Sequence, residues 1–186
     1  MANLADYEIH VRGKKEEAYM LYAATPCADF KQILRADWID DDFIIHFNGN
    51  CKWGLDYNAT DDYNGTIDSG RIDVQNLDEA GQGYWNISLK KKSELLHCEI
   101  EAYELMDDTD MYEESFVHLK NGVVIESKQA SCDKIEWDPE EYPEYEEFCE
   151  DFDIDPEEIS ESDFEMDEWG CMVYLIGEPL DYSFTF

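Results

Sequence analysis

Positive charge is scarce in this sequence. Lys and Arg number 13 against 47 Asp and Glu, so the 186 residues carry a formal net charge of −34 at pH 7. The imbalance grows along the chain: residues 1–36 are neutral overall, whereas residues 135–186 contain twenty acids and neither Lys nor Arg. A surface this negative repels phosphate groups, which excludes direct binding to nucleic acid or to an anionic membrane.

Long apolar runs, paired cysteines and catalytic motifs are missing as well. No run of about 18 apolar residues occurs, and the N-terminal residues contain no signal-peptide core. We therefore expect a cytoplasmic protein. The six cysteines never form a C-x-x-C pair and are expected to be small buried side chains. Because no P-loop, G-x-G-x-x-G, G-x-S-x-G or H-E-x-x-H motif occurs, we expect neither an enzyme nor a bound cofactor.

Apolar side chains are plentiful enough for one core. Hydrophobic residues make up 44% and aromatic residues 14% of a chain whose length corresponds to a single domain, residues 1–186. Apolar and polar residues alternate over 7–11, which predicts a strand, and helical spacing over 14–24 predicts a helix. A short helix or a loop follows at 28–36. The turn signal Asn48-Gly49-Asn50, with apolar runs on both sides, predicts a hairpin.

Later parts of the chain indicate more strands than helices. A helix is predicted at 87–95, followed by strand alternation from Leu96. Asn121-Gly122 is a strong hairpin signal, and apolar stretches at 171–176 and 182–186 predict the last strands. Since few β-α-β crossovers are available, the expected fold class is α+β with a mainly antiparallel sheet.

The most acidic stretch, residues 138–169, carries seventeen carboxylates and no Lys, Arg or His. Its aromatic residues and one cysteine recur three or four residues apart, as along one side of a helix: Tyr142, Tyr145, Phe148, Cys149 and Phe152. Asp-Pro pairs at 138–139 and 155–156 are typical helix starts. We expect two short acidic helices, at 143–152 and 156–162, in a helical insertion before the C-terminal strands. A disordered acidic segment is the alternative.

Calcium binding is a second hypothesis for this stretch. Asp151, Asp153 and Asp155 have the spacing that opens an EF-hand loop. The sixth position of that loop needs Gly and holds Pro156, and the twelfth needs Glu and holds Ser162. No dedicated metal site is therefore expected, although so many carboxylates favour weak binding of divalent cations. An acidic chaperone of basic proteins is a third hypothesis.

A catalytic cysteine is a further alternative. Cys51 has the cationic neighbour Lys52, and His10 or His46 could serve as a base if the sheet brought one of them close. A strongly negative field raises the pKa of a thiol and opposes formation of the thiolate. The sequence therefore disfavours a catalytic cysteine.

The charge density of the acidic stretch matches that of a nucleic acid. Duplex DNA presents one negative charge per ~1.7 Å, so the twenty acids of residues 135–186 correspond to about 34 Å of duplex, roughly ten base pairs. Carboxylates held on ordered elements would take the places of phosphates in a basic groove. In composition and charge layout, most strongly over 135–169, the chain resembles the DNA-mimic proteins of phages and mobile elements, such as anti-restriction and anti-CRISPR inhibitors.

This resemblance implies a function without chemistry of its own. Such a protein binds the basic nucleic-acid-binding surface of a nuclease or another DNA-handling defence protein in the host cell cytosol, and inhibits it stoichiometrically. The sequence leaves the monomer and the homodimer open. The residues expected to bind the partner are acids of the stretch: Glu140, Glu141, Glu144, Glu146, Glu147, Glu150, Asp151, Asp153, Glu157, Glu158, Glu161, Asp163, Glu165 and Asp167.

Overall fold

A computed structural model of the chain describes residues 4–25, 27–52, 88–108, 111–139, 141–152, 154–156, 158–166 and 171–186. The chain forms two compact units. Unit 1 comprises Met1–Asp107, Glu113–Ala130 and Leu180–Phe186, and unit 2 comprises Asp108–Tyr112 and Ser131–Pro179. The long strand β6 (Val123–Trp137) contributes its first part to unit 1 and its last part to unit 2.

Antiparallel β-sheet dominates the fold, and the expected α+β class is wrong. The described residues contain eight strands but only three α-helices, of seven to ten residues each. Two segments account for much of the difference: 28–36, for which a short helix or a loop was expected, and 156–162, for which a helix was expected. Residues 31–36 of the segment 28–36 belong to a strand, and the described residues of 156–162 form turns and part of a 3-10 helix. Segments this short do not hold a helix without a packed apolar face.

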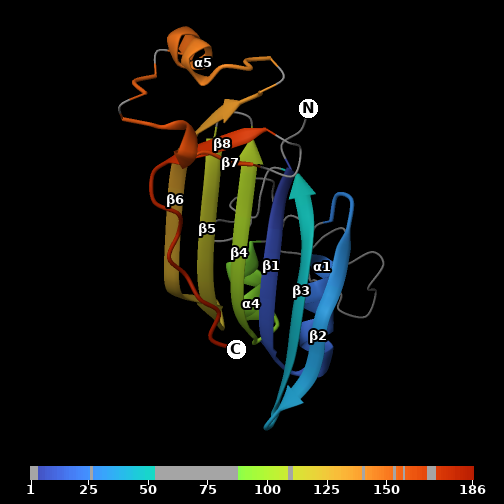
Figure 1. Ribbon diagram of the computed structural model, residues 1–186. Helices are drawn as coiled ribbons and strands as arrows, with labels where there is room; N and C mark the ends of the chain where they lie inside the picture. The colour runs from blue at the N-terminus through green and yellow to red at the C-terminus, as the bar shows by residue number, and fades with distance from the viewer. Residues whose placement is uncertain are drawn as a thin grey trace, which may run out of the picture. The chain divides into compact units, whose positions relative to one another are not determined.

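The sheet of unit 1 has the strand order β2-β3-β1-β4-β5-β6 (Figure 1). In this order β4 spans Glu99–Asp108, β5 spans Met111–Lys120, and only the first part of β6 belongs to unit 1. Its N-terminal half contains β1 (Leu4–Gly13), α1 (Lys15–Ala24), β2 (Lys31–Ile39) and β3 (Asp42–Lys52). The predicted N-terminal strand and helix are thus confirmed. β1 pairs antiparallel with β3 on one side and with β4 on the other.

The hairpin expected at Asn48-Gly49-Asn50 lies elsewhere. β3 runs straight through these residues, and the turn is at Asp40-Asp41, between β2 and β3. Gly49 permits a close approach instead, because a Cβ there would lie 2.6 Å from the hydroxyl of Tyr7. The Asn50 side chain accepts a hydrogen bond from the amide of Asp29 at 2.9 Å. The expected second arm of the hairpin, after Lys52, lies outside the described residues.

The second half of unit 1 agrees better with the sequence patterns. It contains α4 (Leu89–Leu95), β4 (Glu99–Asp108), β5 (Met111–Lys120) and the first part of β6. The helix expected at 87–95 and the strand expected from Leu96 are both present within a few residues. Asn121 and Gly122 take positive φ values of 50° and 78°, the turn geometry predicted for the β5–β6 hairpin.

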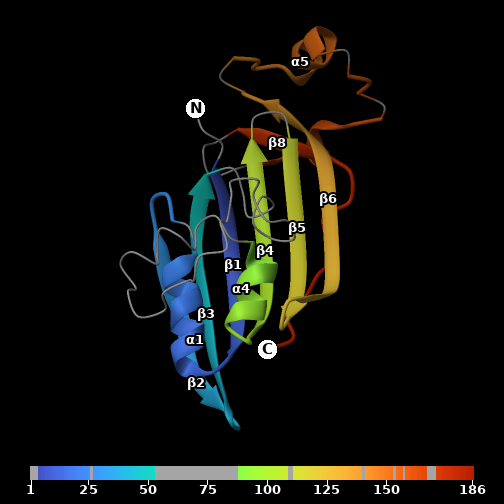
Figure 2. The same cartoon turned by 180° about the vertical axis from the view of Figure 1, so that it is seen from behind.

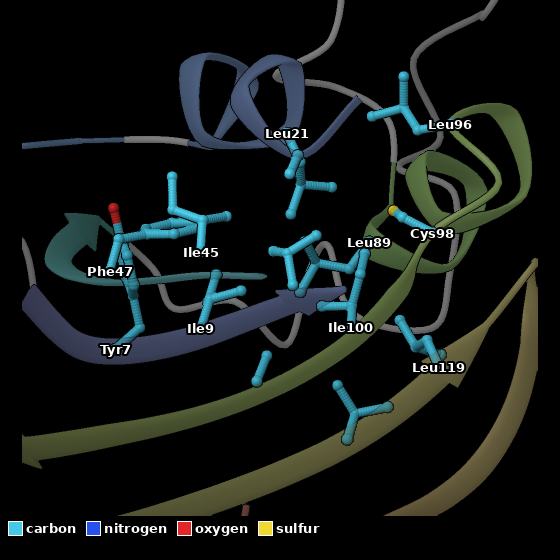
Figure 3. Packing of buried hydrophobic residues seen from close by; sticks show 14 of the residues in the cluster. Tyr7, Ile9, Leu21, Ile45, Phe47, Leu89, Leu96, Cys98, Ile100 and Leu119 are labelled. Atoms are coloured by element: carbon cyan, nitrogen blue, oxygen red, sulfur yellow. The ribbon is translucent and has the colours of Figure 1, made fainter. Parts of the chain in front are cut away.

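The core of unit 1 lies between the sheet and the helices α1 and α4, which cover the same face (Figure 2). Figure 3 shows side chains of the sheet and of both helices meeting in this layer. Ile9 of β1 packs with Ile45 of β3, Leu21 of α1 and Leu89 of α4, and all four are inaccessible to solvent. The alternation that predicted β1 therefore identified its buried face correctly.

A segment near the end of the chain, Leu180–Phe186, covers the other face of this sheet (Figure 1). The strand expected at 182–186 is wrong, because side chains rather than a neighbouring strand hold this backbone. The amides of Leu180 and Thr185 each donate a 2.7 Å hydrogen bond to a carboxylate, of Glu114 and Glu101 respectively. Three aromatic side chains of the segment stack on residues of the sheet: Tyr182, Phe184 and Phe186.

Unit 2 is smaller and contains the acidic stretch. The last part of β6 pairs antiparallel with β8 (Met172–Ile176), which confirms the strand expected at 171–176 and pairs in turn with β7 (Glu165–Met166). The chain between β6 and β7 forms α5 (Tyr145–Phe152) and the 3-10 helix η1 (Glu161–Asp163). Of the two predicted acidic helices, the first is confirmed as α5 and the second is reduced to η1.

Candidate acidic interface

A cluster of aromatic side chains and one cysteine forms the core of unit 2. Its buried members are Trp137, Tyr145, Phe148, Cys149 and Phe164. Phe148 is only 1% exposed, and the ring centroids of Trp137 and Phe164 lie 6.0 and 6.1 Å from its own. Because these rings come from β6, α5 and the residue before β7, they give a short and highly charged segment a fixed position.

Two of these aromatic residues also hold the irregular backbone beside α5. The indole nitrogen of Trp137 donates to the carbonyl of Tyr142 at 2.8 Å, and the hydroxyl of Tyr145 donates to the carbonyl of Ile159 at 2.7 Å. Burial raises the pKa of Tyr145 above its ordinary value, and Cys149 adds to this effect. The hydroxyl therefore keeps the proton that it donates.

Helix α5 separates its apolar residues from its acids. Each residue turns the helix by about 100°, which places Tyr145, Phe148, Cys149 and Phe152 along one side. The remaining residues of the helix lie on the opposite side, and all four are acids: Glu146, Glu147, Glu150 and Asp151. The last turn contains no base. The sequence of α5 therefore presents four carboxylates as one strip.

The described acids of this region are all accessible. Every described carboxylate between residues 138 and 165 is exposed. Ten of the fourteen predicted partner-binding residues are among them: Glu141, Glu144, Glu146, Glu147, Glu150, Asp151, Glu158, Glu161, Asp163 and Glu165. The other four, Glu140, Asp153, Glu157 and Asp167, lie outside the described residues. Asp138 and Asp155, which are not among the predicted residues, are exposed too.

Unit 2 contains little positive charge that could pair with these acids. Lys134 is its only Lys or Arg, it has no His, and the Lys134 ammonium lies 2.7 Å from a carboxylate oxygen of Glu136. Asp163 is held differently: the amide and hydroxyl of Ser160 both donate to it at 2.8 Å and lower its pKa. The acidic surface of unit 2 therefore stays uncompensated by bases of its own unit.

Two large apolar side chains are exposed among these acids. Phe152, the last residue of α5, is 56% exposed, and Met166 of β7 is 72% exposed. Phe152 continues the apolar side of α5 and contacts the ring of Phe148, with 4.7 Å between the centroids. Its spacing places it on the same side of the helix as Tyr145 and Phe148, which are buried, but Phe152 is exposed because the helix ends there.

The chemical alternatives find little support in the described residues. No group of three or more His, Cys, Asp or Glu among them could hold a metal ion, and Asp153 of the EF-hand-like spacing lies outside them. Cys51 is buried, and it lies five residues from His46 on β3, so the two side chains point to opposite faces of the sheet. Burial and the neighbouring His10 lower the pKa of His46 to about 4.

Comparisons with other proteins give no family for this chain. No protein-family model matches it, and searches of curated proteins and of solved structures found no similar protein. None of the helices among the described residues combines the length and the apolar character that crossing a membrane requires.

Proposed function

We propose that unit 2 binds the cationic, nucleic-acid-binding surface of a partner protein and inhibits that protein by occupying the surface, without catalysing a reaction. The strongest support is the joint exposure of the described acids between residues 138 and 165 on a scaffold whose aromatic cluster is buried. The partner class that suits this charge pattern is a nuclease or another DNA-handling defence protein.

Release of counterions would drive this binding. When Lys and Arg of a basic groove meet carboxylates, ions condensed on both surfaces return to the solvent. Such binding weakens steeply with salt, since the Debye length falls from about 30 Å at 0.01 M to about 10 Å at 0.1 M ionic strength. Duplex DNA competes for the same groove and should displace the protein from it.

Phe152 and Met166 would give this electrostatic contact its specificity. Charge complementarity mainly accelerates association, whereas a few buried side chains usually dominate interface affinity. Phe152 directly follows Asp151 on α5 and is well exposed. We expect it to enter an apolar pocket beside the basic groove of the partner.

Affinity capture with a charge-matched control tests the proposal. The immobilised protein should retain basic nucleic-acid-binding proteins from a nuclease-treated lysate, and an excess of short duplex DNA should release them. Replacing the α5 acids by amides, as E146Q, E147Q, E150Q and D151N together, should reduce capture by about tenfold or more. The control removes four exposed acids of unit 1, as E16Q, D29N, E126Q and D181N.

The two variants separate local charge from net charge, because both lose four acids. If the control loses capture as strongly as the α5 variant, the position of the acids is irrelevant and the proposal fails. It fails as well if the captured proteins stay bound in high salt and excess DNA. Thermal unfolding checks the fold of both variants, and the α5 variant should be at least as stable as the wild type because like charges have been removed.

A further inference from the structure

β2 is the outermost strand of unit 1 in the described part of the chain. Its side chains are exposed almost throughout, and four of them are large and apolar. Leu34 and Trp38 are the most exposed of these, at 51% and 56%. A long, exposed and apolar edge strand is a template for pairing with another chain.

The geometry of the β2–β3 hairpin indicates which backbone groups of β2 face outward. A two-residue turn joins the strands, so Ile39 and Asp42 are its closing hydrogen-bonded pair. Alternation along an antiparallel ladder then directs the N–H and C=O groups of Trp38 and Ala36 away from β3. In agreement, the amide of Trp38 donates to the side chain of Asp37, at 2.8 Å.

The side chains around Ala36 are complementary to themselves. Suppose that a second β2 strand pairs antiparallel with the first, so that the two Ala36 residues lie opposite each other. Arg35 of each copy then lies opposite Asp37 of the other copy. Leu34, at the bulge between Ile33 and Arg35, then lies near Trp38 of the second copy, which brings together the two most exposed apolar side chains of the strand. Within one chain the Arg35 guanidinium and the Asp37 carboxylate are 3.9 Å apart on one face of the strand. Two copies therefore build a square of four alternating charges.

We propose that two copies of this chain form a twofold-symmetric dimer through β2, in the register that places Ala36 opposite itself. A twofold interface requires a self-complementary surface, and the placement of Arg35 and Asp37 about Ala36 supplies one. Residues 1–36 carry five acids and five bases, so two copies of this part of the chain do not repel each other through net charge.

The first part of β6, the other outer strand of unit 1, provides a matched control. It also carries an ion pair, between Glu126 and Lys128 at 3.1 Å, and exposed apolar residues. Lys128, however, donates to the carbonyl of Asp181 at 2.9 Å, so the segment Leu180–Phe186 already lies beside this strand. Charge reversal on β6 should therefore leave the dimer unchanged.

Mixing two charge-reversed variants tests both the dimer and its register. In R35D an aspartate faces Asp37 of the second copy, and in D37R an arginine faces Arg35. Each variant alone should therefore dimerise about tenfold more weakly than the wild type, or worse. In an equal mixture, both cross-strand pairs of the heterodimer are attractive again. Sedimentation velocity over a concentration series, in the presence of reductant, measures dimerisation of each variant and of the mixture.

The register is supported if the dimer is restored in the mixture while each variant by itself dimerises weakly. A wild-type chain that remains monomeric throughout the series overturns the proposal, as does dimerisation of R35D and D37R at the wild-type level. Loss of the dimer in E126K, with β2 substitutions silent, overturns it too. Hydrogen exchange of β1 checks that each variant is folded. Salt distinguishes this dimer from partner binding by unit 2: screening the repulsion between two chains of charge −34 should maintain or strengthen the dimer but weaken partner binding.

Discussion

Unit 1 buries some of its acidic side chains, whereas unit 2 exposes those of its acidic stretch. In unit 1, Glu101 is fully buried and accepts hydrogen bonds from the amide and the hydroxyl of Thr185, while Glu114 accepts one from the amide of Leu180. In unit 2, every described acid between residues 138 and 165 is exposed. An acid of the first kind fixes a segment of the chain, whereas an acid of the second kind is presented to the solvent.

The two units also differ in the bases that lie near their acids. In unit 1, Glu99 lies 2.8 Å from His118 and 2.9 Å from Lys120. Burial alone would raise the pKa of Glu99, but hydrogen bonds from Lys120 and His118 outweigh it and lower the pKa. Unit 2 has Lys134 alone. The net charge of −34 is therefore the sum of two populations of acids, those held by hydrogen bonds or bases and those exposed to the solvent.

One core substitution should unfold unit 2 without unfolding unit 1. Phe148→Ala removes the ring at the centre of the unit 2 cluster, which should cost about 3–5 kcal/mol. This ring contacts the rings of Trp137, Tyr145 and Phe164, so without it unit 2 should unfold while unit 1 keeps its structure. Amide hydrogen exchange should show lost protection in α5 and unchanged protection in β1. Loss of protection in both would mean that the units unfold as one.

Phe152→Ala is the matched control, because it removes the same ring from the same helix. Phe152 is 56% exposed, so this substitution should cost about 1 kcal/mol or less. Equal loss of protection in the two variants would show that helix propensity or charge, and not the buried cluster, maintains α5. The same variant is also expected to weaken partner capture by unit 2, since Phe152 is the proposed anchor.

The sequence predicted those elements of the fold whose signals are local. β1 alternates cleanly, and the β5–β6 turn is set by Asn121-Gly122 alone. β2 escaped prediction because a bulge between Ile33 and Arg35 interrupts its alternation and because its exposed side chains mark no buried face. The segment Leu180–Phe186 alternates like a strand, but the carboxylates that bind it are more than sixty residues away in sequence.

The candidate site was more predictable than the fold, because charge is read directly from composition. Burying a charged carboxylate is costly, so exposure of the acids around α5 follows from solvation alone. What the sequence could not give is the exposure of Phe152, which has the same helical spacing as Phe148. Whether a ring on an apolar stripe is covered depends on where neighbouring segments end, and no local pattern encodes that.

A buried base in unit 1 predicts a pH dependence that unit 2 should lack. Lys92 on α4 is inaccessible to solvent and donates to the carbonyl of Ala24 at 3.1 Å. Burial, and to a smaller extent Lys31, lowers the pKa of Lys92 to about 7. Above this pH the unfolded chain binds one proton more than the folded chain, so the unfolding free energy should rise with pH. Above about pH 9 an opposing trend begins, because burial raises the pKa of Cys98 to about 12.

Urea unfolding of unit 1 between pH 7 and pH 9 should therefore show a rise of about 1–2 kcal/mol. Lys92→Met should remove most of the rise, since methionine fills the site without a titrating group and only the smaller contribution of Lys31, whose pKa burial also lowers, is left. Lys90→Met changes an exposed residue of the same helix and should retain it. A rise of full size in Lys92→Met would assign the pH dependence to another group.

The smallest effect expected is a stabilisation of α5 by salt. Three acid pairs in this helix are three or four residues apart, Glu146–Glu150, Glu147–Glu150 and Glu147–Asp151, and each costs about 0.2–0.5 kcal/mol. The acids near the C-terminal end of α5 also interact unfavourably with the helix dipole, and no base in the last turn offsets this effect. Salt screens this repulsion, so the free energy of local opening of α5 should rise by about 1 kcal/mol.

Unit 1 should respond less, because the same salt weakens attractive pairs such as Glu99–Lys120. Hydrogen exchange of α5 and β1 amides at low and high sodium chloride measures both responses in one sample. Glu147→Gln removes two of the three repulsive pairs and should reduce the α5 response by more than half. If α5 and β1 gain equally, or if Glu147→Gln responds like the wild type, a general salt effect explains the gain. The acids of α5 would then be too well separated or too well hydrated to repel one another, and a partner would gain correspondingly less from binding them.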